Sequence, residues 1–201
     1  MQETKRRSFI EEARRAQIVA AAIDTLAELG YGKASLTQIA KRAGISTSLI
    51  SYHFKEKDEL MQETFTQVYS NWTTYVQDQL SADSTATERL HTYIEANLAY
   101  MGTRPKHFEA MIEIIFNARS EDGTLLYRGD EDSEGALQLA ALLAEGQKTG
   151  EFRQFDVQNM AIALRGTIDQ FLGQIARRPS FNLEAYTAQL IDLFNRAILQ
   201  E

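Results

Sequence analysis

Small polar side chains between Ser35 and Phe54 (SLTQIAKRAGISTSLISYHF) have the types and spacing that best fit a chemical task. Ala40, Gly44 and Ile50 match a helix-turn-helix: a small residue where two helices meet, a glycine in the turn and an apolar residue pointing back. Such a unit places its second helix in the DNA major groove. The expected chemistry is therefore recognition of bases and phosphates.

Capping residues flank both helices of this motif. Ser35 and Gln38 predict a capping box, in which each side chain satisfies the backbone N–H of the other residue. Ser46 is placed to cap the second helix. Any two short packed helices could share the Ala–Gly–Ile pattern, but caps and turn in the same register favour a helix-turn-helix.

Residues for common catalytic chemistry are missing or badly spaced. The chain has no cysteine, which excludes disulfides, thiolate metal sites and cysteine nucleophiles. His53, His91 and His107 lack HExxH spacing, and neither a GxSxG motif nor a phosphate-binding glycine loop is present. We therefore expect no enzyme activity and no cofactor. An enzyme assembled from residues distant in sequence stays the alternative.

The acidic segment from Asp130 to Ala141 partly imitates a calcium-binding loop. Ala141 stands where such a loop needs a bidentate glutamate. We prefer an acidic helix start capped by Asp132 or Ser133, and we expect no metal.

Composition indicates an ordinary globular chain of 201 residues, with 44% hydrophobic and 24% charged residues. No apolar run approaches the roughly 20 residues that span a bilayer, and no signal-peptide core follows the basic N-terminus, so we predict a cytoplasmic protein. The net charge is −7, but residues 1–60 carry +2 and the remainder −9. A weakly basic head on an acidic body suits a small DNA-binding domain joined to a larger domain with another role.

Helical periodicity dominates, and the fold class is predicted to be all-α. One apolar face runs through a first helix that Gly30 and Gly32 end: Ile18, Ala21, Ala22, Thr25, Leu26 and Leu29. Further helices are expected at 36–43, 47–53, from residue 57, and at 86–101, 105–118, 132–149, 156–177 and 182–200. We place a helix-turn-helix domain at residues 1–56 and a larger helical domain at residues 57–201.

The last two predicted helices carry wide apolar stripes, which could bury one side in their own domain and another against a second copy. Intrachain core is the alternative for any single residue. For the pair of helices we favour a four-helix dimer interface, with these residues: Leu164, Ile168, Phe171, Leu172, Ile175, Tyr186, Leu190, Leu193 and Phe194.

Residues 14 to 65 resemble the DNA-binding domain of TetR-family transcriptional repressors. The resemblance rests on RRAQIVAAAIDTLAELGYGKASLTQIAKRAGIS followed by YHFKEKDEL, and the helix-turn-helix is most similar to the betaine/choline-type branch. It covers about the first third of the chain. It implies a homodimer on a palindromic operator, with recognition helices about 34–36 Å apart.

The resemblance also implies which residues meet DNA. Thr47 to His53 would form the recognition helix, with Tyr52, His53 and Lys57 on phosphates. The candidate contacts are Ser35, Thr37, Gln38, Ser46, Thr47, Ser48, Ser51, Tyr52, His53 and Lys57. Leu49 and Ser51 replace a Thr and a Tyr found in many members, so their base contacts cannot be transferred. For His53, a role in packing the helix end is an equal alternative.

A small-molecule effector bound by the larger domain is a further implication of the resemblance, and a regulator without any effector is the alternative. Apolar faces suggest these pocket residues, with core packing as the alternative for each: Phe65, Tyr69, Trp72, Tyr100, Phe108, Met111, Ile112, Ile115, Phe116 and Gln170. Trp72 and Tyr69 in an acidic domain would suit a cationic ligand through cation–π contact.

Overall fold

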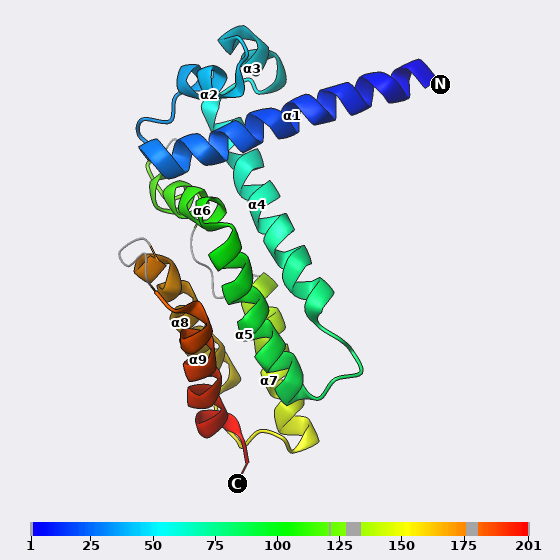
Figure 1. The fold of residues 1–201 in the computed structure, drawn as a ribbon, viewed down its shortest axis with the longest axis vertical. Coiled ribbons are helices and arrows are strands. Elements are labelled where there is room, and N and C mark those ends of the chain that lie inside the picture. Colours follow the sequence, from blue (N-terminus) through cyan, green and yellow to red (C-terminus); the bar gives the residue numbers. More distant parts are fainter. Residues whose placement is uncertain (1, 121, 128–133, 176–180, 201) are drawn as a thin grey trace. The chain divides into compact units, whose positions relative to one another are not determined.

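The computed structural model describes residues 2–120, 122–127, 134–175 and 181–200, where the regular elements are all helices (Figure 1). They are α1 (Gln2–Leu29), α2 (Leu36–Ala43), α3 (Thr47–His53), α4 (Lys57–Gln79), α5 (Ala86–Thr103), α6 (Pro105–Asn117), α7 (Glu134–Thr149), α8 (Val157–Ile175) and α9 (Leu183–Ile198). Isolated β-bridges join Arg119 to Leu125 and Phe152 to Leu199. The all-α prediction is confirmed.

The two helices of the motif have the predicted limits, 36–43 and 47–53, because caps and a glycine mark their ends. The other helices differ from prediction by one or two residues where their ends are described, except α1. It begins at Gln2, well before the apolar face that starts at Ile18. Residues 130–133 of the possible calcium loop, with the alternative caps Asp132 and Ser133, lie outside the described residues, while residues 134–141 form the start of α7.

The chain forms two compact units that do not follow a single cut in the sequence. One contains α1–α3, α4 up to Ser70, and α6. The other contains α4 from Asn71, α5 and α7–α9. The predicted functional division at residues 56 and 57 stays a prediction.

In the first unit, α6 is attached to the end of α1 by charged groups. Lys106 Nζ lies 2.7 Å from Asp24 and 3.2 Å from Glu28, and the Glu113 carboxylate accepts the backbone N–H of Tyr31 at 2.8 Å. Fully buried apolar side chains from five segments form the core beneath: Ile18, Leu26, Ile39, Ile50, Phe54, Leu60 and Phe108. The helix-turn-helix therefore shares its core with α1, α4 and α6.

In the second unit, the turn after α7 closes onto the end of α9. An added Cβ at Gly146 would lie 2.1 Å from the Phe152 ring, so glycine permits this close packing. Arg153 donates its backbone N–H to Ile198 O at 2.8 Å and its Nε–H to Ala197 O at 2.6 Å. These bonds satisfy carbonyls at the C-terminal end of α9, which have no partner within the helix.

Glu151, in the same turn, satisfies N–H groups at the start of α5. Its carboxylate accepts the backbone N–H of Ala86 at 3.0 Å and of Thr87 at 2.9 Å, and the hydroxyls of Thr87 and Thr149 at 2.8 and 3.1 Å. Burial opposes the charge, but these hydrogen bonds hold the pKa of Glu151 below its ordinary value of 4.5.

We expect Glu151→Gln to lower the free energy of unfolding by about 1 kcal/mol at pH 7, a modest value because water screens this partly exposed carboxylate. Since folding lowers the pKa, the charge stabilises the fold above the unfolded-state pKa. That contribution disappears as the pH falls through the folded-state pKa. Denaturant titrations from pH 7 to pH 3.5 should show the gap between variant and parent closing below about pH 4.5.

Asp83→Asn, at an exposed position between α4 and α5, is the matched control and should change stability by less than about 0.5 kcal/mol. A gap for Glu151→Gln that stays constant with pH would show that its charge does not stabilise α5.

Candidate nucleic-acid interface and ligand cavity

The turn between α2 and α3 has the geometry that its sequence predicts. Gly44 lies in the left-handed region at φ 68° and ψ 31°, and Ile45 N–H donates to Ala40 O at 3.1 Å. Gln17 Nε2 of α1 also donates to Ala43 O at 2.8 Å. The last carbonyls of α2 thus have partners, and α3 leaves the turn in one defined direction.

The predicted caps are confirmed in part. Ser46 Oγ accepts the N–H of Leu49 at 3.2 Å, and Ser35 Oγ accepts that of Gln38 at the same distance. The reciprocal capping box at Ser35 is not formed, because its N–H donates to Lys33 O at 2.9 Å instead. The sequence pattern missed this competing acceptor in the preceding turn.

One face of α3 is lined by hydroxyl groups and exposed to solvent. Thr47, Ser48, Ser51 and Tyr52 are all exposed, and Tyr52 is 72% exposed despite its large ring. Ser51 Oγ donates to Thr47 O at 3.2 Å, and the hydroxyls of Ser46 and Ser48 lie 2.9 Å apart. Because a hydroxyl can donate or accept, this face can hydrogen-bond either base edges or phosphate oxygens. Ser35, Thr37 and Gln38 are likewise exposed at the start of α2.

The C-terminal end of α3 is held by Arg15 of α1, a residue for which the sequence predicted no role. Its guanidinium donates to the carbonyl of His53 at 2.7 Å, pairs with Glu63 of α4 at 3.2 Å and lies 4.2 Å from the ring centroid of Phe54. His53 is half-buried, and its ring makes an edge-to-face contact with the ring of Tyr52, with the ring centroids 5.0 Å apart. No local pattern links residues 38 positions apart, so this contact could not be read from the sequence.

Lys57 makes contacts within the protein that the sequence analysis did not predict. Its ammonium donates to the backbone carbonyl of Tyr31 at 2.7 Å and lies 4.2 Å from the centroid of the Tyr31 ring. Loss of hydration in this half-buried position lowers the pKa of Lys57. The phosphate contact of Lys57 stays a prediction, and any such contact would compete with this arrangement.

A cavity of about 430 Å³ lies in the second unit, between α4, α5 and α7. Its apolar wall includes Val76, Leu80, Leu139 and Leu142, and its polar lining includes Trp72, Arg89, Tyr93, Asn97 and Glu145. The volume is in the range that holds a small organic molecule.

Asn97 organises the polar end of this cavity. Its Oδ1 accepts from Trp72 Nε1 at 3.0 Å and from Arg165 at 2.9 Å, while its Nδ2 donates to Tyr93 O at 2.7 Å. The Arg165 guanidinium lies 4.5 Å from the centroid of the Trp72 ring. Burial opposes its charge, but the Tyr93 hydroxyl and the Asp169 carboxylate outweigh that effect and raise the pKa of Arg165.

Of the predicted pocket residues, Trp72 alone lines this cavity among the described residues. Phe65 lies in the first unit, where its ring stacks on that of Tyr69 with the centroids 6.0 Å apart. The centroid of the Tyr127 ring lies 4.2 Å from that of Phe65. Tyr100, Phe108 and Met111 are buried, Ile112 and Ile115 are half-buried, and Phe116 and Gln170 are exposed. Periodicity identified apolar helix faces but could not show which of them border empty space.

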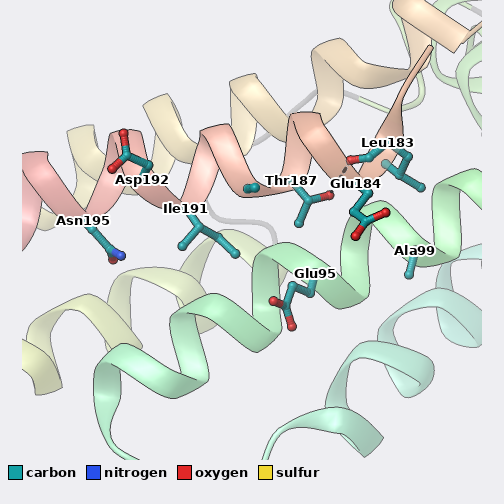
Figure 2. A pocket seen from close by; sticks show the side chains of 9 residues that line it. Glu95, Ala99, Leu183, Glu184, Thr187, Ile191, Asp192 and Asn195 are labelled. Atoms are coloured by element: carbon teal, nitrogen blue, oxygen red, sulfur yellow. Dashed lines mark hydrogen bonds between the residues drawn. The ribbon is translucent and has the colours of Figure 1, made fainter.

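A second hollow is a groove of about 770 Å³ between α5 and α9 (Figure 2). Glu95, Glu184 and Asp192 contribute carboxylates to it, and Leu183 and Ile191 contribute apolar surface. None of the predicted pocket residues lines it among the described residues.

Most of the predicted dimer-interface side chains that are described belong to the core of a single chain. Leu164, Ile168, Phe171, Leu190 and Phe194 are at most 6% exposed. Tyr186 is half-buried and donates its hydroxyl proton to Thr167 O at 2.7 Å, while Leu193 is 54% exposed. The side chains of Leu172 and Ile175 lie outside the described residues. The stripes therefore face inward at most of these positions, which is the intrachain alternative.

Comparison with known proteins identifies the family. Residues 18–64 match the family model described as bacterial regulatory proteins, tetR family. The HTH-type transcriptional regulator BetI of Klebsiella pneumoniae is 30% identical over 162 residues, which cover 80% of each chain. The chain belongs to the TetR family of transcriptional regulators. This confirms the resemblance found in residues 14 to 65.

A second relative in sequence and a solved structure are each similar to most of the chain. A fatty acid metabolism regulator of Bacillus subtilis is 27% identical over 156 residues, which cover 77% of this chain and 79% of that protein. A transcriptional regulator of Saccharomonospora viridis, solved in complex with choline, has a TM-score of 0.71 at 19% identity and covers 94% of this chain and 100% of that chain.

Within the described residues of this TetR-family chain, no three His, Asp or Glu side chains are grouped so that they could hold a metal ion. None of the described helices combines the length and apolarity needed to cross a membrane.

Arg15→Ala should lower the free energy of unfolding by about 1–2 kcal/mol, because a charged hydrogen bond to α3 and a cation–π contact are lost together. Arg14→Ala is the matched control: Arg14 bonds only to Gln17 among the described contacts and should change stability by less than about 0.5 kcal/mol. Urea denaturation followed by circular dichroism measures both. Equal effects of the two variants would show that Arg15 does not anchor α3.

Proposed function

We propose that this TetR-family protein is a ligand-responsive repressor that binds a palindromic operator as a homodimer and is released by a small-molecule effector. The DNA-binding part of the proposal rests on the exposed hydroxyl groups along one face of α3. The other face of this helix is packed, and its N-terminus is capped. A rigid helix with free hydrogen-bonding groups is what major-groove recognition requires.

The charge distribution supports an electrostatic contribution to this binding. Residues 1–60 carry a net charge of +2 while the whole chain carries −7. Because such a head attracts phosphate while the body repels it, the affinity for DNA should fall as salt rises.

The cavity of about 430 Å³ supports the effector part of the proposal, and the choline complex of the Saccharomonospora viridis protein shows that a relative of this fold holds a small ligand. An effector releases DNA only if it binds more tightly to a conformation that cannot engage both half-sites. We propose repression rather than activation on the basis of the family resemblance.

Fluorescence anisotropy of labelled DNA from upstream of the gene tests operator binding across a salt series. Saturable binding that survives competitor DNA and weakens with salt supports the proposal. If this DNA and a selection from random palindromes both fail to bind specifically, the operator-binding proposal is wrong.

Thr47→Ala should reduce operator affinity about tenfold, because one good contact to a base edge contributes roughly 1–3 kcal/mol to discrimination. Its thermal stability should stay unchanged, since the side chain is exposed. Thr74→Ala, at an exposed position of α4 in the other compact unit, is the matched control and should bind the operator normally. Normal binding by Thr47→Ala would remove Thr47 from the interface.

For the homodimer, we propose an interface on the exposed faces of α8 and α9 rather than on their buried stripes. Ile162 of α8 and Leu193 of α9 are 47% and 54% exposed, and Ala163 is exposed next to Ile162 in the sequence. At Gly166 an added Cβ would meet no atom within 4 Å, so a partner helix could approach closely. Exposed apolar and small residues together favour helix–helix association.

Leu193→Glu should shift the protein from dimer to monomer, because a charge would be buried without a partner at the interface. Light scattering coupled to gel filtration gives the mass, and circular dichroism checks that helicity is kept. Leu137→Glu, at a position 48% exposed on α7, is the matched control and should remain dimeric. A dimeric Leu193→Glu would place the interface elsewhere.

A further inference from the structure

Arg89, a residue of the lining of the cavity in the second unit, has a buried hydrogen-bond donor without a partner among the described residues. Arg89 Nε is buried and has no hydrogen-bond acceptor among the described residues. The same guanidinium pairs through NH2 with Glu145 at 2.6 Å, and the Arg89 side chain is only 19% exposed. A buried donor without an acceptor costs free energy, so such a group in a cavity points to an acceptor supplied from outside.

Other polar groups at this end of the cavity are already engaged. Both polar atoms of the Asn97 side chain have hydrogen-bond partners: Oδ1 accepts from two donors, and Nδ2 donates to the carbonyl of Tyr93. The apolar part of the wall includes Val76, Leu80, Leu139 and Leu142, and further polar side chains in the lining are Thr73, Gln77, Ser81 and Gln138. The lining therefore combines apolar surface with Arg89, whose Nε–H has no acceptor among the described residues.

The Trp72 ring is a poor site for a cationic ligand, although a tryptophan in an acidic domain suggests one. Arg165 already supplies a cation 4.5 Å from its centroid. A second cation on this ring would be repelled by that guanidinium and by Arg89 in the cavity lining. Glu145 and Asp169, the carboxylates beside these arginines, are paired with them.

We propose that this cavity binds an apolar molecule bearing an acceptor oxygen, a carbonyl or a carboxylate, and that the Arg89 side chain shifts on binding so that its Nε–H, covered in the free protein, donates to that oxygen. The inference rests on the proposed effector role and names the chemical class of that effector. It assigns to Arg89 the recognition of the polar end and to the leucine and valine wall the recognition of the apolar body.

Fluorescence of Trp72, the single tryptophan of the chain, reports binding in the full-length protein. The probes are sodium decanoate, methyl decanoate, decyltrimethylammonium bromide and choline chloride, each below any micelle-forming concentration. We expect saturable changes with decanoate, methyl decanoate or both, and none with the two ammonium compounds. Binding of decanoate alone would identify a carboxylate as the acceptor. Binding of both compounds would show that a carbonyl oxygen is sufficient, whether it belongs to an acid or to an ester.

Arg89→Lys keeps the charge that pairs with Glu145 but removes the Nε–H, and should weaken binding of the oxygen-bearing probe about tenfold. Arg196→Lys is the matched control, since Arg196 is 79% exposed on α9 and pairs with Asp192. Glu145→Gln removes the carboxylate that competes for Arg89 and should tighten decanoate binding. A merely destabilised protein could not show that gain.

Saturable binding of either ammonium probe with unchanged affinity in Arg89→Lys would overturn the assignment, as would no response to both oxygen-bearing probes. Operator release is measured separately by DNA anisotropy. A probe that binds through Arg89 without releasing DNA would leave the ligand class standing and contradict the effector role. If choline released the DNA and no probe bound through Arg89, the effector role would stand and the proposed ligand class would be wrong.

Discussion

Burial of one face of α3 is the constraint on which the DNA-binding surface depends. A seven-residue helix is too short to be stable by itself in water, because nucleation costs more than its few hydrogen bonds return. Ile50 and Phe54 are fully buried, and Arg15 binds the last carbonyl of the helix. These contacts hold the helix in place, which leaves Thr47, Ser51 and Tyr52 free to face solvent.

The second unit uses a buried polar network in a different way. Trp72, Asn97, Tyr93 and Arg165 satisfy one another, and Asp169 balances the charge of Arg165. A network in which every group has a partner is rigid, because any displacement leaves a buried polar atom without a hydrogen bond. Arg89 in the neighbouring cavity is the exception to this rule, and that exception is what connects the cavity to a ligand.

The apolar stripes of the last helices show how far a pattern can be interpreted. A stripe indicates that one side of a helix is buried, but not whether its own chain or a second copy covers it. In α8 and α9, Leu164, Ile168 and Phe194 are covered within the chain, while Ile162 and Leu193 remain exposed. The dimer proposal therefore moves to residues that the stripe itself did not contain, apart from Leu193.

Local sequence determined the helix-turn-helix, because its caps, its left-handed glycine and its inward isoleucine act over a few residues. The all-α class and most helix limits followed from the same short-range periodicity and from breakers such as Pro105. Tertiary structure alone decided what touches α3 from α1 and which apolar faces border a cavity. Those outcomes depend on residues far apart in sequence, such as Arg15 with His53 or Trp72 with Asn97 and Arg165. Their proximity results from packing, and no local pattern of residue types specifies it.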